Sequence, residues 1–178
     1  DNEFGGFDPE TGEYVIYRTA TTKPPAPWTN VIANQDFGFS ITESGGGFTW
    51  AVNSSENRLT TWRNDPVEDV PSEIVYIRDE ETGKIWTTTP LPASADSPFL
   101  IKHGKGYSVF ENINYGIELK QTVFVDQDDP VKVIRIQCKN HLNRTRRLTL
   151  TYYAEWVLGT LRGITQQYII PEYDANER

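Results

Sequence analysis

Residues 53–66 carry the densest group of polar and aromatic side chains in the sequence, including Arg58, Trp62 and Arg63. They lie where the alternation of apolar and polar residues stops. A planar Trp ring can stack on the C–H face of a sugar, while Arg guanidinium and amide groups bind the sugar hydroxyls. The residue types in this segment therefore indicate a candidate carbohydrate site.

The same segment also has a plainer interpretation as a packed loop. Trp and Arg are enriched where proteins pack against each other. Trp62 would then fill a hole, and Arg58 or Arg63 would pair with Glu56 or Asp65. The residues alone leave both interpretations open.

The other reactive side chains form no recognisable catalytic or metal-binding set. The two histidines, His103 and His141, and the single cysteine, Cys138, fall at no known zinc-ligand spacing. Cys138 shares the alternation of Ile134 and Ile136, so we expect it in the core. The paired carboxylates of a glycosidase cannot be recognised from spacing along the chain. We therefore name no catalytic residue and no metal ligand.

Two short motifs are interpreted as turns. Residues 44–47, Ser-Gly-Gly-Gly, lack the Lys and the following helix of a phosphate-binding loop, so they predict a hairpin turn. The acidic residues 126–129 lack the Gly and the distal Glu of a helical calcium loop, so they predict a solvated turn.

The elements that position these side chains are predicted to be strands, because apolar residues alternate with polar ones along most of the chain. Turn-like segments at 44–47, 79–83 and 112–116 separate several of these runs. No window of comparable length shows the spacing of an amphipathic helix. The alternating runs cover residues 37–41, 48–52, 75–77, 85–87, 107–109, 117–125, 134–138 and 148–158.

Many short strands separated by Gly, Pro and Asn predict an all-β fold, a large antiparallel β-sandwich. The proline-rich segments 24–27 and 90–93 cannot donate the hydrogen bonds of a strand ladder. We expect them at sheet edges or in crossovers. The polar residues 171–178 are expected to begin a linker.

Charge and composition exclude several classes of partner. The 178 residues include 17 basic and 25 acidic ones, for a net charge of -8. Without a basic cluster, we expect no nucleic-acid partner and no direct membrane contact. A single cysteine excludes an intramolecular disulfide, and we expect a cytoplasmic location. The sequence has no Met and begins at Asp1, so we expect a domain of a longer polypeptide.

Eight segments, in order along nearly the whole chain, resemble one enzyme family. They are Gly5–Phe7, Tyr14–Ile16, Pro25–Asn34, Phe37–Phe39, Asn53–Val67, Arg78–Gly83, His103–Gly104 and Tyr153–Gly159. Together they are similar to the N-terminal domain of the inverting disaccharide phosphorylases, glycoside hydrolase family 94. Within that family, the likeness to the phosphorylase region of cyclic β-1,2-glucan synthases and to β-1,2-oligoglucan phosphorylases exceeds the likeness to cellobiose phosphorylase.

The resemblance implies an architecture and a reaction for the parent protein. A β-sandwich of the supersandwich type, residues 1–170, would be followed by a linker starting at 171–178 and by a catalytic (α/α)6 barrel. Inorganic phosphate attacks the anomeric carbon while one carboxylic acid protonates the leaving oxygen, which converts a β-glucoside into α-glucose 1-phosphate. Phosphate is a substrate, so no cofactor is expected. In the family the acid and the phosphate-binding residues lie in the barrel.

The resemblance therefore implies a non-catalytic domain of a glucan or disaccharide phosphorylase or of a cyclic β-1,2-glucan synthase. The domain would pack on the barrel of the same chain or on a second subunit, and four of its residues would contact the acceptor side of a β-glucan or disaccharide. The family usually has Arg where this chain has Ser55 and Pro where it has Thr61. The alternative is a stand-alone carbohydrate-binding module. The candidate substrate-binding residues are Arg58, Trp62, Arg63 and Asn64.

A domain that normally packs on a barrel exposes an apolar face when it is separated from that barrel. We expect a patch larger than the several hundred Å² usual for monomers, and a homodimer as one consequence.

Overall fold

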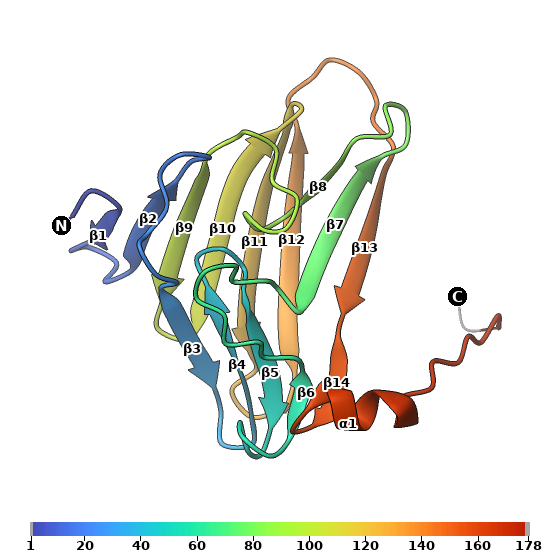
Figure 1. Cartoon of the computed structure of the whole chain (residues 1–178). Helices are drawn as coiled ribbons and strands as arrows, with labels where there is room; N and C mark the ends of the chain where they lie inside the picture. The colour runs from blue at the N-terminus through green and yellow to red at the C-terminus, as the bar shows by residue number, and fades with distance from the viewer. Residues whose placement is uncertain (1, 177–178) are drawn as a thin grey trace.

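The computed structural model describes residues 2–176, which form antiparallel strands in two facing layers (Figure 1). Residue 1 and residues 177 and 178 of the predicted linker lie outside the described residues. The predicted all-β sandwich is confirmed. Helical structure in the described part of the chain is limited to α1 (Arg162–Thr165) and a 3-10 turn (Gln166–Tyr168), which follow the last strand.

One layer is a six-stranded antiparallel sheet. The alternation of buried and less buried residues along its strands places one face against the second layer. Its strands, in spatial order, are β1 (Gly5–Phe7), β2 (Tyr14–Arg18), β9 (Phe99–Gly104), β10 (Tyr107–Asn114), β11 (Ile117–Val125) and β12 (Lys132–Asn140).

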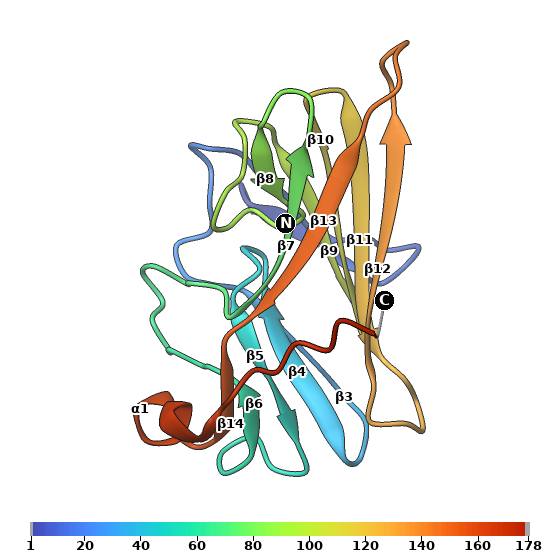
Figure 2. The same ribbon diagram turned by 90° about the vertical axis from the view of Figure 1, so that its right-hand side faces the viewer.

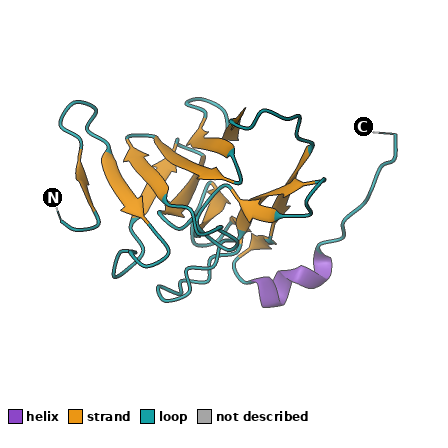
Figure 3. Ribbon diagram, turned by 90° about the horizontal axis from the view of Figure 1, so that it is seen from above, coloured by secondary structure: helices purple, strands orange, loops and turns teal. Residues whose placement is uncertain are grey.

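The second layer consists of two smaller sheets that face this one, as Figure 2 shows. The five-stranded sheet contains β14 (Trp156–Gly159), β6 (Arg58–Thr60), β5 (Gly47–Ala51), β4 (Phe37–Thr42) and β3 (Thr29–Ala33). The three-stranded sheet contains β13 (Leu148–Ala154), β7 (Glu73–Asp79) and β8 (Ile85–Thr87). Strand β13 continues almost directly into β14, so one run of chain joins the two sheets of this layer. The view from above shows α1 standing apart at the edge of the strands (Figure 3).

The predicted hairpins are present, and one of their turns is tighter than expected. The pairs β4–β5 and β7–β8 enclose the two Gly-containing turns predicted from the sequence. Strand β10 runs to Asn114, so the predicted loop at 112–116 is wrong. The turn instead uses Tyr115 and Gly116, with φ of 49° and 77°, and two positive φ values are typical of a two-residue hairpin turn.

The proline-rich segments lie where they were expected. Residues 24–27 belong to the connection from β2 to β3, which crosses from one layer to the other. Residues 90–93 belong to the connection from β8 back to β9. Both segments are crossovers between sheets.

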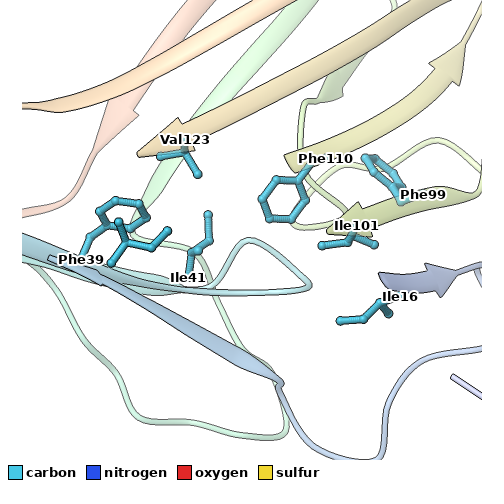
Figure 4. Packing of buried hydrophobic residues seen from close by; sticks show 8 residues of the cluster. Ile16, Phe39, Ile41, Phe99, Ile101, Phe110 and Val123 are labelled. Atoms are coloured by element: carbon cyan, nitrogen blue, oxygen red, sulfur yellow. The ribbon is translucent and has the colours of Figure 1, made fainter. Parts of the chain in front are cut away.

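The hydrophobic core fills the space between the layers in two clusters. In the larger cluster, Phe39 and Ile41 of β4 face Val123, Phe110 and their neighbours from the opposite sheet (Figure 4). The smaller cluster packs Trp86 of β8 on Ile117 and Leu119 of β11. Full burial of one such side chain contributes roughly 1.5–3 kcal/mol, and truncation of a core Phe to Ala costs about 3–5 kcal/mol.

A buried ion pair joins the two layers near the start of β12. Lys132 Nζ lies 2.6 Å from Glu73 Oε2, and the side chains are 14% and 10% exposed. The same carboxylate accepts hydrogen bonds from the Thr60 hydroxyl at 2.8 Å, from the Tyr152 hydroxyl at 2.9 Å and from Thr49. These contacts connect β12 of one layer with β5, β6, β7 and β13 of the other.

One side of the sandwich is open. Within residues 2–176, β12 pairs only with β11 and β13 pairs only with β7, so each strand has a free edge. Between the two strands lies an apolar groove of about 440 Å³, which we call the open side; its lining residues are Val75, Lys132, Ile134, Ile136, Leu150 and Tyr152.

Cys138 is exposed, so its expected place in the core is wrong; it lies on β12 two residues beyond Ile136, which lines the open side. It is opposite Leu119 and shares the inner face of the sheet. The alternation in the sequence correctly predicts that Cys138 lies on the inner face of the sheet. The side chain remains exposed because β12 is an edge strand beside the open groove.

Candidate functional site

The candidate residues Arg58, Trp62, Arg63 and Asn64 line one groove of about 690 Å³. The groove lies between the connection from β6 to β7, residues 61–72, and the outer face of β3, β4 and β5. Alternation along β4 explains this face, because Phe39 and Ile41 point into the core while Ser40 and Thr42 line the groove. The structure therefore brings the four predicted residues together on one concave surface.

Aromatic rings form the apolar part of this groove. The Trp62 ring stacks on Phe48 of β5 with centroids 5.1 Å apart and an interplanar angle of 20°, and the Phe48 ring lies 5.2 Å from that of Trp50. Trp50 can approach β4 closely because residue 38 is Gly; a Cβ there would lie 2.6 Å from the indole. Phe48 is buried, whereas Trp62 is 43% exposed.

Arg58 lies beside the aromatic stack. Its guanidinium carbon is 5.4 Å from the Trp62 ring centroid and 5.5 Å from that of Phe48. These two distances and the 5.1 Å stacking distance form a nearly equilateral triangle. The guanidinium therefore lies on the Phe48 side of the Trp62 ring and does not cover the opposite face of the indole.

Arg63 is held by a carboxylate far along the chain. Its Nη2 lies 3.0 Å from both carboxylate oxygens of Glu155, which lies between β13 and β14. Arg162 of α1 donates to the same carboxylate at 2.5 Å. The side chain of Glu155 is 5% exposed, while the two Arg side chains are about half exposed. Two charge-assisted contacts thus compensate the burial of one carboxylate.

The backbone of Glu155 fixes the loop as well. Thr61 N–H donates to the Glu155 carbonyl at 3.0 Å, and Glu155 N–H donates to the Ser72 carbonyl at 2.8 Å. A Pro at position 61, which is usual in the family, could not make the first of these bonds. Both ends of the loop are therefore tied to one residue.

The expected pairing of Arg58 or Arg63 with Glu56 or Asp65 is wrong. Arg58 Nε instead donates to the Ser54 carbonyl at 3.1 Å. Asp65 accepts from the backbone N–H groups of Val67 and Glu68 at 2.9 and 3.1 Å. These backbone hydrogen bonds, first that of Glu68, lower the pKa of Asp65 below its ordinary value. Asp65 therefore shapes the loop and does not neutralise an Arg.

Two further groove residues have backbone conformations that few side chains adopt. Asn64 and Asp69 have φ of 51° and 48°, and Asn and Asp tolerate this region better than most residues. The Thr42 hydroxyl donates to Asp69 Oδ2 at 2.6 Å. Burial nevertheless raises the pKa of Asp69 above its ordinary value.

The remaining reactive side chains lie away from the groove and apart from one another in the sheet. His103 is on β9, and its Nδ1 is 2.9 Å from the Ser108 hydroxyl. Burial lowers the pKa of His103 to about 4. His141 follows β12 and contacts Glu118 at 2.5 Å. Across residues 2–176, no group of three or more His, Cys, Asp or Glu residues is arranged to hold a metal ion.

Nor does any helix in the described part of the chain have the length and apolar character needed to cross a membrane.

Chemically, the groove offers an aromatic surface that includes the partly exposed Trp62 indole, two guanidinium groups, an amide and two carboxylates. This combination can bind a polyhydroxylated ring through stacking and hydrogen bonds. Sequence reasoning missed Phe48 and Glu155, which support Trp62 and Arg63. The signal for Glu155 was a single charged residue inside the apolar alternation of residues 148–158.

Comparison with known proteins agrees with the resemblance seen in the sequence. The chain is 34% identical over 178 residues to the cyclic beta-(1,2)-glucan synthase NdvB of Rhizobium meliloti (strain 1021), covering 99% of the chain and 6% of that protein. It is 29% identical over 176 residues to the N,N'-diacetylchitobiose phosphorylase of Vibrio furnissii, covering 97% of the chain and 22% of the enzyme. It is 27% identical over 186 residues to the solabiose phosphorylase of Paenibacillus borealis, covering 98% of the chain and 23% of the enzyme.

The chain thus spans less than a quarter of the length of each of these relatives. The family model for the glycosyl hydrolase 94 supersandwich domain matches residues 12–178. The sandwich architecture described above agrees with that match. The chain therefore belongs to the supersandwich domain family of glycosyl hydrolase 94.

Proposed function

We propose that this chain is a non-catalytic domain of a larger carbohydrate-active enzyme and that its groove contacts the acceptor side of a β-glucan. The parent would be a glucan or disaccharide phosphorylase or a cyclic β-1,2-glucan synthase. The convergence of Arg58, Trp62, Arg63 and Asn64 on one groove is the observation that carries this proposal. The similarity to a cyclic glucan synthase and to two disaccharide phosphorylases supports the substrate class.

The geometry supports a glucan more than a charged ligand. The partly exposed ring of Trp62 suits the apolar C–H face of a glucose ring. Arg63 is already paired with Glu155, and the carboxyl groups of Asp65 and Asp69 also line the groove. An anionic ligand would meet these carboxylates, whereas neutral hydroxyls can bond to acids and guanidinium groups alike.

The chemistry of the parent is proposed to take place outside this domain. Phosphorolysis of a β-glucoside to α-glucose 1-phosphate needs one carboxylic acid to protonate the leaving oxygen, with phosphate as the attacking group. We assign that acid and the phosphate site to the (α/α)6 barrel of the same polypeptide. The sandwich would pack against that barrel and contribute Trp62 and its neighbours to the cleft.

The test is the Trp62→Ala substitution in the full-length parent protein, with Trp156→Ala as the control. The two Trp side chains are 43% and 46% exposed, but only Trp62 lines the groove. Loss of one stacking contact is expected to raise the KM for a β-1,2-glucooligosaccharide acceptor about tenfold, while the KM for phosphate stays the same. Equal KM values for Trp62→Ala and the unaltered enzyme would contradict a role for the groove in acceptor binding.

A stand-alone carbohydrate-binding module is the second candidate, and the completeness of the groove within one chain favours it. That function predicts micromolar to low-millimolar affinity of the isolated chain for β-1,2-glucooligosaccharides or cellobiose. The assembly function predicts almost no binding by the isolated chain. Titration calorimetry of the 178-residue chain, with and without phosphate, distinguishes the two functions.

A further inference from the structure

The open side of the sandwich has the features of an incomplete sheet. Strand β13 contains no charged residue, no Pro and no Gly, and its neighbour across the groove, β12, is also an edge strand. Natural edge strands usually carry charges, Pro or bulges that prevent further pairing. The side chains of Leu150, Tyr152 and Tyr153 on β13 are 47%, 49% and 43% exposed. An apolar strand with a free edge is therefore available for an additional strand.

The C-terminal segment Tyr168–Asp174 has matching features. From Ile169 onward it is extended and irregular, and the side chains of Tyr168, Ile170 and Tyr173 are 74%, 78% and 86% exposed. Three large apolar side chains within six residues are costly to leave in water. Pro171 is compatible with a strand at the edge of a sheet, where one side of the strand needs no partner.

Charge also matches the segment to the open side. Strand β12 carries no acidic residue, and besides Lys132, which is paired with Glu73, it carries Arg135 and Lys139. The segment carries Glu172 and Asp174 and no basic residue. Attraction between a basic edge and an acidic segment favours their association and fixes its orientation.

The segment begins near the open side of its own molecule, because α1 contacts β14, the continuation of β13. Figure 2 shows it running from α1 across the space between β13 and β12, and Figures 1 and 3 show that it stands away from both strands. Seven residues in a strand span about 23 Å, and β13 also has seven residues. No long loop would have to be ordered for the segment to reach the groove, so the entropy cost of closing it in the same chain is small.

We propose that the segment Tyr168–Asp174 docks on the open side of its own sandwich as an additional strand along the free edge of β13. Docking covers the groove lined by Ile134, Ile136 and Leu150 and places the acidic end of the segment near the basic edge of β12. The interaction surface is thus intramolecular. Its occupant is an extended, apolar and acidic strand.

The single native cysteine provides a direct test. In the full 178-residue chain, a nitroxide attached to Cys138 on β12 is expected to broaden the amide NMR signals of residues 168–174 and to do so equally at low and high protein concentration. The substitution Ile170→Asp is expected to remove most of this broadening. Val67→Asp is the matched control, because Val67 is 82% exposed and lies in the groove loop, and it is expected to leave the broadening unchanged.

A second label position guards against displacement of the segment by the label. Gln137→Cys in a Cys138→Ser chain places the nitroxide on the outer face of β12 and should give the same broadened residues. Absence of broadening from both positions overturns the proposal. Broadening that occurs between a labelled chain and a separate isotope-enriched chain also overturns it, because the occupant is then a second copy.

Discussion

The ion pair between Lys132 and Glu73 allows a quantitative test of what holds the two layers together. We predict that Lys132→Met lowers the free energy of unfolding by about 3 kcal/mol at pH 7. Removal of one partner of a buried pair costs about 3–5 kcal/mol, because the remaining charge is left in a poorly solvated site. The lower end applies here, since the Thr60 and Tyr152 hydroxyls still donate to Glu73. Met keeps most of the aliphatic stem, so no large cavity is added.

The pH dependence of this loss follows from the pKa of Glu73. Burial by itself raises that pKa, but Lys132 and the hydroxyl donors lower it below the ordinary Glu value of 4.5. A carboxylate with a depressed pKa contributes its full stability above 4.5 and loses it as the pH falls through the folded-state value. In Lys132→Met the burial effect dominates and raises the pKa. The difference between the two chains should therefore begin to shrink above pH 4.5, as the pH falls through the raised pKa of the variant, and should be smallest below the lowered pKa of the unaltered chain.

Urea unfolding followed by Trp fluorescence at several pH values measures both effects. Lys120→Met is the control, because Lys120 pairs with Glu111 at 2.8 Å on the surface and is 43% exposed. That substitution should cost less than about 1 kcal/mol. A loss below 1 kcal/mol for Lys132→Met at pH 7, or one that does not shrink in acid, would refute the reasoning.

Three further predictions concern a turn, the groove loop and the open side. Gly47→Ala should destabilise the domain by more than about 1 kcal/mol in thermal unfolding, because its φ is 133° and a Cβ would lie 2.0 Å from a β4 carbonyl oxygen. Gly12→Ala is the control and should cost less, because Gly12 has a φ of 71° but a Cβ there would meet no neighbouring atom. Glu155→Gln should speed hydrogen exchange of the amides of residues 61–72 roughly tenfold, since Arg63 loses its buried partner; unchanged exchange would show that the loop is held by other contacts. Static light scattering should show a monomer for the 178-residue chain, whose open side is covered by its own segment, and association at high concentration for Ile170→Asp, which uncovers that apolar face; association of the unaltered chain would count against intramolecular docking.

The sequence predicted the strands β4, β5, β7, β8 and β10–β14, because one buried face imposes a period of two on the side chains. It named no run for β1, β2, β3, β6 and β9, which have three to six residues each. It also failed where the buried face carries polar residues. Asn112 and Asn114 continue the inward phase of Phe110 and are buried, but their residue type is typical of turns. The end of β10 was therefore placed too early. Alternation also gave the correct face for Cys138 but contained no information about whether another strand covers it.

For the candidate site, too, the sequence predicted some residues and missed others. Arg58, Trp62, Arg63 and Asn64 are close in sequence, so their composition alone suggested a shared surface. Their supports come from elsewhere in the chain: Phe48 from β5 and Glu155 from the junction of β13 and β14. These are tertiary contacts, which local spacing cannot predict. Local spacing offers only Glu56 and Asp65 as Arg partners in the packed-loop interpretation, whereas the partner of Arg63 is the distant Glu155.

The junction at Glu155 also determines when the groove can form. The Arg63–Glu155 contact joins residues that are 92 positions apart, and the Thr61 side-chain contact with the same residue spans 94 positions. Contacts of such separation form late, because the entropy of closing a long loop is lost before the contact stabilises the chain. During synthesis the hairpin of β4 and β5 can pair long before residue 155 has emerged. The groove is thus among the last parts of the domain to acquire its shape, and a nascent chain that stops before β14 presents Trp62 and Arg63 without the residue that positions them.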